Sequence, residues 1–227
     1  ASWVSLMLPK TLVVIPTFNE AANIVALITE VRRLNPHVHV LVVDDNSPDG
    51  TADRVEELGA ASNGAIHCLR RPGKQGLGRA YIAGFEWGLN HQYEVLVEMD
   101  ADFSHRPTDL ATVLKAVEAN DFAVGCRWTK GGSTLNWSVW RKAISIGGST
   151  YSRLILGYPL HDWTGGFNAW RSLGVQRLGL EEIKSEGYRF QIELKYRACA
   201  AGFRGVEVPI TFDERREGQS KMSSRIV

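Results

Sequence analysis

Two carboxylates separated by a single residue, Asp100 and Asp102, follow the short apolar run 95–99. If the chain stays extended there, their side chains point the same way. Two neighbouring carboxylates repel each other, and a divalent cation such as Mg²⁺ or Mn²⁺ removes that repulsion while binding water and phosphate oxygens. Ser104 offers a further, weaker oxygen ligand. The spacing therefore favours a metal and phosphate site, and an Asp-rich turn that only caps the helix after Pro107 is the alternative.

The apolar runs that position these acids alternate with helical patterns along the first half of the chain. The runs cover 11–16, 38–44, 66–69, 95–99 and 122–126. This alternation indicates an α/β domain with a mostly parallel central sheet flanked by helices. Polar residues follow four of the five runs, and they are Thr17, Asn19, Glu20, Asp44, Asp45, Asp100, Asp102 and Arg127. Because ligands of such sheets bind beyond the carboxyl ends of the strands, we expect the site at that edge.

The second half of the chain is less regular. Its patterns predict a helix over 138–157, a turn and short strand within 164–171, a helix over 188–201 and a strand over 205–211.

One stretch of the second half is basic and contains no acid. Between residues 122 and 161 there is no Asp or Glu, while Arg127, Lys130, Arg141, Lys142 and Arg153 are interleaved with Trp, Leu and Ile. Such a pattern fits the anionic head groups of a membrane surface. Nucleic acid is the competing anion, but the stretch is aliphatic and the formal net charge of the chain is only +1. A core helix with charged ends is the structural alternative.

Several common kinds of site are disfavoured. The three cysteines are far apart and show no CxxC spacing, which argues against a zinc site or a disulfide framework. The glycine-rich segment 73–79 matches neither GxGxxG nor the P-loop pattern, so a redox dinucleotide site is not expected. No apolar run reaches the roughly 18 residues of a membrane-spanning helix, and we expect no signal peptide.

Three further segments carry groups that suit a nucleotide or a phosphate. Asp44 or Asp45 can accept hydrogen bonds from a ribose or from the edge of a base. Lys74, in the glycine-rich segment, can face a diphosphate. Arg215 and Lys221 lie in a polar tail that could close over a phosphate.

Longer motifs make the chain similar to a known family. It resembles the polyprenol (dolichol) monophosphate mannose synthases, members of glycosyltransferase family 2 with the GT-A fold, and among them the actinobacterial catalytic domains. The resemblance extends from about Thr11 to Met222, and its WRKAIS and ERREGQSKM segments are the ones specific to this group. The matching motifs are VVIPTFNE, VVDDNSPDGT, GLGRAYIAGF, MDADFSHRP, GCRW, TGGFNAWR, EGYRFQIEL, WRKAIS and EVPITFDERREGQSKM.

The resemblance implies a role for each matched residue. Arg127 matches an arginine beside the transferred sugar and the donor phosphate, and with Asp100 and Asp102 it forms the expected catalytic set. The metal is expected on Asp100 and Asp102, and more weakly on Ser104, whose position is often Gln in relatives. The donor is expected on Pro16, Thr17, Glu20, Asp44, Asp45, Lys74, Gly76, Asp100, Ala101 and Asp102. The acceptor phosphate is expected on Arg141, Ser145, Arg215 and Lys221.

The resemblance also implies a domain organisation and a cellular place. We expect a peripheral protein on the cytoplasmic side of a membrane, with a membrane-anchoring partner or a fused membrane domain and no nucleic acid. The expected parts are an N-terminal extension (1–10) and a single GT-A catalytic domain (11–227), with a nucleotide-sugar and metal half (11–127), an acceptor half (128–227), a membrane-facing amphipathic helix (about 138–157) and a mobile loop (about 213–224).

The implied reaction is the transfer of mannose from GDP-mannose to a polyprenyl (dolichyl) monophosphate, with inversion at the anomeric carbon. The acceptor phosphate is already an anion near neutral pH, so it needs no general base. That agrees with the lack of a His or Cys constellation in the sequence. The alternatives are a polyprenyl-phosphate glucosyltransferase that uses UDP-glucose, and a non-catalytic module that binds nucleotide sugars or lipid phosphates.

Overall fold

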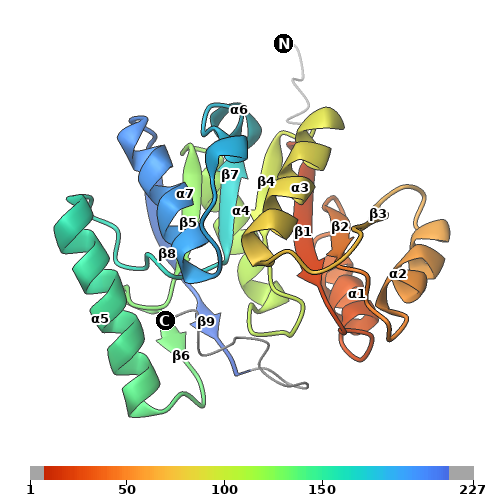
Figure 1. Ribbon diagram of the computed structural model, residues 1–227, viewed down its shortest axis with the longest axis horizontal. Coiled ribbons are helices and arrows are strands. Elements are labelled where there is room, and N and C mark those ends of the chain that lie inside the picture. Colours follow the sequence, from red (N-terminus) through yellow and green to blue (C-terminus); the bar gives the residue numbers. More distant parts are fainter. Residues whose placement is uncertain (1–7, 215–227) are drawn as a thin grey trace, which may run out of the picture.

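A seven-stranded sheet forms the centre of the computed structural model, which describes residues 8–214 (Figure 1). The strand order is β3-β2-β1-β4-β7-β5-β8. All pairings are parallel except those of β7, which runs antiparallel to both of its neighbours, β4 and β5. The mostly parallel sheet predicted from the sequence is therefore confirmed. The strands are β1 (Thr11–Thr17), β2 (His39–Asp44), β3 (Ile66–Arg70), β4 (Val95–Glu98), β5 (Phe122–Cys126), β7 (Asn168–Arg171) and β8 (Gly205–Pro209).

Helices cover both faces of this sheet. One buried apolar cluster includes residues of α3 and α7, and the other includes residues of α1, α2 and α4. Successive residues of β1 enter opposite clusters, Leu12 and Val14 one and Val13 and Ile15 the other, which explains its uninterrupted apolar sequence. The helices are α1 (Ile24–Leu34), α2 (Thr51–Ala60), α3 (Leu77–Asn90), α4 (Leu110–Val117), α5 (Val139–Leu156), α6 (Ser172–Val175) and α7 (Tyr188–Ala200), with 3-10 turns at Pro107–Asp109 and Leu180–Glu182.

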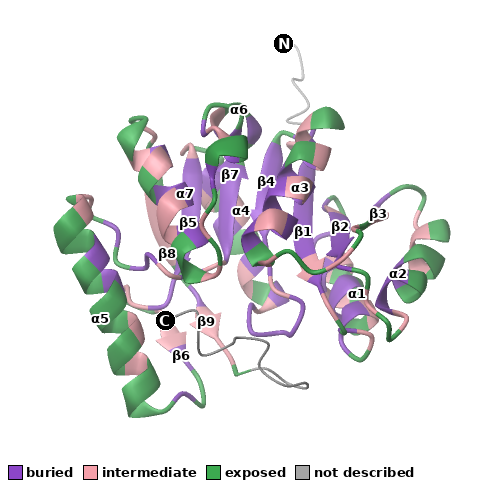
Figure 2. Cartoon of the chain, in the orientation of Figure 1, coloured by how far each residue is buried: buried purple, intermediate pink, exposed green. Residues whose placement is uncertain are grey.

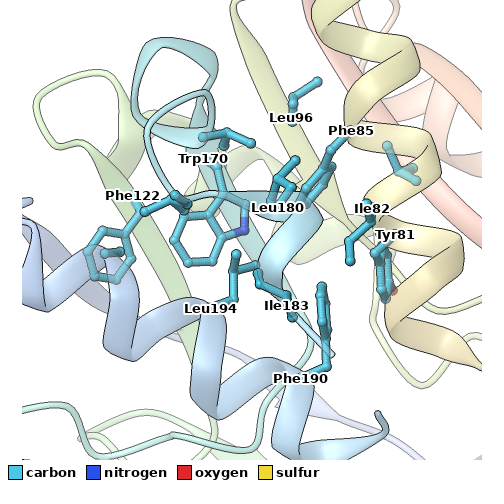
Figure 3. Packing of buried hydrophobic residues seen from close by; sticks show 14 of the residues in the cluster. Tyr81, Ile82, Phe85, Leu96, Phe122, Trp170, Leu180, Ile183, Phe190 and Leu194 are labelled. Atoms are coloured by element: carbon cyan, nitrogen blue, oxygen red, sulfur yellow. The ribbon is translucent and has the colours of Figure 1, made fainter. Parts of the chain in front are cut away.

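Aromatic side chains join α3, α7 and the sheet in the first of these clusters (Figure 3). Tyr81 of α3 stacks on Phe190 of α7 with 6.1 Å between ring centroids. On the sheet, Phe122 of β5 stacks on Trp170 of β7 at 5.0 Å. The first contact joins α3 to α7 and the second joins β5 to β7. Helix α7 and strand β7 both contribute residues to the site described below.

The strand β7 makes the two halves of the chain parts of one sheet. It comes from the second half of the sequence, yet it lies between β4 and β5 of the first half. A second, two-stranded parallel sheet pairs β6 (Ser133–Thr134) with β9 (Thr211–Phe212). The sequence did not predict this small sheet, because two residues carry no periodic signal. The strand expected over 205–211 ends at Pro209, and the chain then continues into β9.

Helix α5 is exposed along most of its length (Figure 2). Its only buried residues are Ser149 and Ser152, while Trp140 is 80% exposed and Leu154 76% exposed. The apolar residues Trp140, Ile144, Tyr151, Leu154 and Ile155 recur at helical spacing and share one face. The alternative of a core helix with charged ends is therefore wrong, since small polar residues face the protein and large apolar ones face outward. Within residues 8–214, no helix is both long enough and apolar enough to cross a membrane.

Close packing of α3 on the sheet gives a test of the fold. A Cβ atom on Gly84 would lie 2.3 Å from Cγ1 of Val14 and 3.1 Å from Cγ2 of Val43, both buried in the sheet. We expect Gly84→Ala to lower the free energy of unfolding by about 1–3 kcal/mol, measured by urea denaturation.

The matched control is Gly148→Ala, in the exposed helix α5. An added Cβ there meets nothing within 4 Å, so the better helix propensity of Ala should leave the protein equally stable or up to about 1 kcal/mol more stable. Equal effects of the two substitutions would contradict the packing of α3 described here.

Candidate active site

Asp44, the last residue of β2, joins the carboxyl end of β2 to that of β1. Its Oδ1 accepts hydrogen bonds from the hydroxyls of Thr17 at 2.7 Å and Ser47 at 2.6 Å, and its Oδ2 accepts the backbone N–H of Ser47 at 2.8 Å. Asp44 and Thr17 are both buried. Of the residues predicted to bind the donor, these two are thus engaged with each other and organise the loop that follows β2.

Asp45 points to a different partner, the guanidinium of Arg71. Nη1 of Arg71 lies 2.8 Å from Oδ1 of Asp45, and both side chains are nearly buried. Burial raises the pKa of Asp45, and the positive charge of Arg71 offsets part of that increase. The sequence analysis missed Arg71, although its place just before the glycine-rich segment was a signal.

Four further predicted donor residues lie at the end of β1, shortly after it, or in the segment that precedes α3. Lys74 places its ammonium 5.0 Å from the ring centre of Phe18, the residue after β1 and Thr17. Gly76 precedes α3 with a φ of +95°, a conformation that favours glycine. Pro16 lies near the end of β1, and the buried Glu20 donates its backbone N–H to Oγ1 of Thr51 at 3.0 Å. The contact between Lys74 and Phe18 therefore brings the glycine-rich segment to the carboxyl end of β1.

Residues 100–104, which follow β4 and carry Asp100 and Asp102, form a turn, the acidic turn. Strand β4 ends at Glu98 and the backbone turns at residues 101 and 102, so the extended conformation expected for the motif is wrong. The turn still brings both carboxylates into one small segment. Oδ1 of Asp102 accepts the backbone N–H of Ser104 at 3.0 Å, and Oδ1 of Asp100 accepts the hydroxyl of Tyr81 at 3.3 Å. Ala101 lies buried between them.

His105 follows this turn and contacts its backbone, and sequence reasoning did not single it out. Its Nδ1 accepts the backbone N–H of Asp100 at 3.0 Å, and its ring stacks on Phe167 with 5.0 Å between centroids. Burial lowers the pKa of His105, which agrees with a neutral ring whose Nδ1 is an acceptor. His105 thus orients the backbone of Asp100.

The oxygens of this turn suit a hard, partly hydrated cation. Oγ of Ser104 is buried and has no hydrogen-bond partner among the described residues, so it is a third oxygen beside the two carboxylates. Within residues 8–214, no group of three or more His, Cys, Asp or Glu could hold a metal ion. That excludes from this part of the chain a cage made of such side chains, but Mg²⁺ or Mn²⁺ takes only one or two carboxylates when water and phosphate supply the rest. The donor set therefore fits such an ion.

Arg127, directly after β5, forms a buried two-point ion pair with Asp162. Nε donates to Oδ2 at 2.8 Å and Nη2 donates to Oδ1 at 2.7 Å, and the backbone N–H of Arg127 also reaches Oδ2 at 3.0 Å. Burial alone would raise the pKa of Asp162, but the charge and hydrogen bonds of Arg127 hold it below its usual value. Nη2 donates a further bond to Oγ1 of Thr164 at 2.9 Å, which leaves Nη1 as the nitrogen outside this fork. No pattern in the sequence predicts Asp162 as the partner.

Aromatic rings link Arg127 to the acidic turn on one side and to α5 on the other. The ring of Phe212 lies 5.3 Å from the ring of His105 and 5.5 Å from Cζ of Arg127. Trp137 lies between two guanidinium groups, with its ring centroid 5.4 Å from Cζ of Arg127 and 4.0 Å from Cζ of Arg141. Such contacts between cations and rings are attractive, so they hold both arginines in place.

The predicted acceptor residues are only partly covered by the structure. Arg141 is about half exposed on α5 and pairs with Glu214, whose Oε1 lies 3.5 Å from Nη1. Ser145 follows one turn later on the same helix and is half-buried. Arg215 and Lys221, with most of the loop predicted at 213–224, lie outside the described residues.

Sequence comparison identifies the family. Residues 12–177 match the model of glycosyl transferase family 2. The chain is 49% identical to polyprenol monophosphomannose synthase of Mycolicibacterium smegmatis, over 94% of this chain and 81% of that protein. It is 47% identical to undecaprenyl-phosphate mannosyltransferase of Micrococcus luteus, over 96% and 89% respectively.

Solved structures of two transferases share the fold. Glucosyl-3-phosphoglycerate synthase of Mycobacterium tuberculosis, in complex with Mn²⁺, UDP and phosphoglyceric acid, has a TM-score of 0.67 at 18% identity, over 93% of this chain and 72% of that one. A mannosyltransferase of Pyrobaculum calidifontis, in complex with GDP-Man and Mn²⁺, has a TM-score of 0.62 at 16% identity, over 95% and 59% respectively. The chain therefore belongs to glycosyltransferase family 2, among relatives named as polyprenyl-phosphate mannosyltransferases, and is a glycosyltransferase with the GT-A fold.

Proposed function

We propose that the protein transfers mannose from GDP-mannose to a polyprenyl (dolichyl) monophosphate and inverts the anomeric carbon. One observation carries this proposal: a continuous set of contacts, through Phe212, Arg127 and Trp137, joins the acidic turn to Arg141 on the exposed helix α5. A metal-dependent donor site beside an arginine on an apolar, basic helix suits a lipid that ends in a phosphate. The names of the two bacterial relatives support the acceptor and the sugar.

The donor would lie along the carboxyl ends of β1, β2 and β4. Asp45, next to Arg71, is the carboxylate there for a ribose or base edge, and Lys74 is the nearby cation for a diphosphate. A Mg²⁺ or Mn²⁺ ion held by Asp100, Asp102 and, more weakly, Ser104 would neutralise the leaving diphosphate. Pro16, Thr17, Glu20, Asp44, Gly76 and Ala101 complete the proposed donor site by shaping the loops around these groups.

The acceptor phosphate would approach from the side of α5. Arg141 offers a planar guanidinium that can bind two phosphate oxygens, and Ser145 offers a hydroxyl one turn away. Arg215 and Lys221 are proposed to close over the same phosphate. Because this phosphate is already an anion, the protein has only to orient it and to stabilise charge, with Nη1 of Arg127 directed at the reacting groups.

The outward apolar face of α5 is proposed to rest on the membrane that carries the acceptor. Its exposed Trp140, Ile144 and Leu154 share one face, and Arg141, Lys142 and Arg153 of the same helix can bind anionic head groups. We place this contact on the cytoplasmic side of the membrane, with the protein bound peripherally.

The first test combines a panel of donors and acceptors with a substitution in the acidic turn. Labelled mannose should pass from GDP-mannose to polyprenyl phosphate in the presence of Mg²⁺ and stop when a chelator is added. Asp102→Asn removes a negative charge from the turn, and we expect it to lower kcat by at least about 100-fold.

Glu57→Gln, which alters an exposed carboxylate on α2, is the matched control and should transfer at the wild-type rate. Near-normal transfer by Asp102→Asn would refute the metal role. Turnover of UDP-glucose without turnover of GDP-mannose would refute the proposed donor.

A second prediction concerns the acceptor. Arg141→Ala should raise the KM for polyprenyl phosphate by about 10- to 100-fold, because a hydrogen bond to a charged group is worth about 1.5–3 kcal/mol. The KM for GDP-mannose should change less than about threefold. Lys142→Ala removes one charge from the neighbouring position of α5 and should have a much smaller effect on both constants. A loss confined to the KM of GDP-mannose would show that Arg141 serves the donor instead.

A third prediction concerns the membrane. The combined variant Trp140→Ser, Ile144→Ser and Leu154→Ser removes exposed apolar surface, so it should weaken sedimentation with anionic phospholipid vesicles by at least about tenfold. Transfer to a short-chain, water-soluble acceptor should stay near the wild-type rate. Leu173→Ser, equally exposed on α6, is the control and should bind vesicles normally. Unchanged vesicle binding by the triple variant would exclude α5 as the contact.

A further inference from the structure

We propose that Lys195 of α7 is a positioning residue for glycosyl transfer, because its ammonium group holds the loop 162–165 and thereby fixes the orientation of Arg127. The effect on transfer rests on the role of Arg127 in the proposed function. The effect on the orientation of Arg127 does not, since it follows from contacts within the protein.

The side chain of Lys195 is completely buried, and all hydrogen-bond partners of its ammonium among the described residues are backbone oxygens. Nζ donates to the carbonyl oxygens of Asp162 at 3.0 Å, Trp163 at 3.2 Å and Gly165 at 2.7 Å. An ammonium has three N–H donors, so these three bonds use all of them. A buried lysine with three carbonyl partners in one short loop acts as a clamp on the backbone of that loop.

The clamped loop is the one that holds Arg127. Asp162 supplies both carboxylate oxygens to the guanidinium, and Thr164 supplies its hydroxyl to Nη2. The loop also folds back on itself, since the backbone N–H of Gly165 donates to Oδ1 of Asp162 at 2.9 Å. No helix or strand includes residues 162–165, so the backbone depends on side-chain bonds such as those of Lys195 to keep its shape.

The same network reaches the acidic turn through Glu98, the last residue of β4. Asn168, Trp170 and Gln191 donate to the Glu98 carboxylate at 2.7, 3.0 and 2.8 Å, and Asn168 also donates to the carbonyl of Gly165 at 3.3 Å. Glu98 lies two residues before Asp100. Asn168 therefore connects the loop that Lys195 holds to the strand that leads into the acidic turn.

This buried network contains two acids and two bases. Glu98 and Asp162 are its acids, Arg127 and Lys195 are its bases, and all four side chains are buried. Replacement of Lys195 by an apolar residue leaves three carbonyl oxygens without a partner in the interior and removes the positive charge that faces Asp162, both of which are unfavourable. The loop would then be expected to shift, and Arg127 with it.

The titration of Lys195 gives the network a distinctive pH dependence. Burial lowers the pKa of Lys195 to about 8, while Asp162, Glu98 and Glu207 act to raise it and Arg127 acts to lower it further. Above that pH the neutral amine has only two N–H donors, so one carbonyl loses its partner. The effect of this titration on stability has the opposite sign to its expected effect on activity. Between about pH 8 and the ordinary lysine pKa of about 10.4, the unfolded chain binds more protons than the folded one. The free energy of unfolding therefore increases with pH in this range. A fall in activity with no matching fall in stability is therefore the signature of positioning.

The first readout follows Arg127 itself and needs no substrate. In the wild type at pH 7, the Nε–H proton of Arg127 should give a slowly exchanging NMR signal, assigned by its absence in Arg127→Lys. We expect its chemical shift to change as pH rises through about 8, which base-catalysed exchange alone would not cause, and the signal to be lost or strongly shifted at pH 7 in Lys195→Met, which has a similar length and no charge. Lys184→Met, an exposed lysine between the second 3-10 turn and α7, is the control and should keep the signal.

The second readout is kinetic. Lys195→Met should lower kcat by about 10- to 100-fold and leave the KM for GDP-mannose within about threefold, since misplacement of a catalytic group acts mainly on the chemical step. The basic limb of the wild-type kcat profile near pH 8 should be absent from the variant. Combined with Asp162→Asn, the two losses should be far from additive, because both act through Arg127.

The outcomes separate the two proposals. An unchanged Arg127 Nε–H signal in a folded Lys195→Met protein, or a wild-type chemical shift that does not change as pH rises through about 8, would overturn the positioning role. Absence of mannosyl transfer by the wild type would instead overturn the proposed function, and the NMR signal would still decide the role of Lys195. If Lys195→Met did not fold, the wild-type pH titration would provide the same decision without a variant.

Discussion

The ion pair between Arg127 and Asp162 is the interaction on which the rest of the site depends. Both side chains are buried, and a buried charge without a partner is strongly unfavourable, so the end of β5 and the loop 162–165 must stay together. That loop leads into β7, which lies antiparallel between β4 and β5 and so brings the second half of the chain into the sheet of the first. The ion pair thus joins the two halves at the place where donor and acceptor are proposed to meet.

The same arrangement separates two kinds of surface. The ends of β1, β2 and β4 present carboxylates and cations suited to a nucleotide sugar, while α5 turns its large apolar side chains outward and only small serines inward. Phe212 and Trp137 connect the two surfaces through contacts with Arg127. Because an anionic acceptor needs no deprotonation, a site built from arginines and acids, without a dedicated base, is sufficient for the proposed displacement.

The sequence predicted those features that depend on local patterns. Buried parallel strands appear as apolar runs, so the sheet and the edge that holds Asp45 and Asp100 were predicted correctly. The helical spacing of its residues likewise predicted α5. The pairing of Arg127 with Asp162 and the clamp by Lys195 were not predicted, since they join residues 35 and about 30 positions apart and single polar residues in irregular segments carry no periodic signal. The extended form of the acidic motif was wrong because the backbone turns at residues 101 and 102, directly between the two carboxylates.

In the proposed reaction a lipid phosphate attacks the donor sugar directly, without a covalent intermediate on the protein. The configuration of the product is the decisive measurement, because GDP-mannose carries an α linkage and one displacement inverts it. NMR of the isolated polyprenyl-phosphate mannose should therefore show a β-linked mannosyl phosphate. An α-linked product would require two displacements or a front-side reaction, and it would contradict this account of the site.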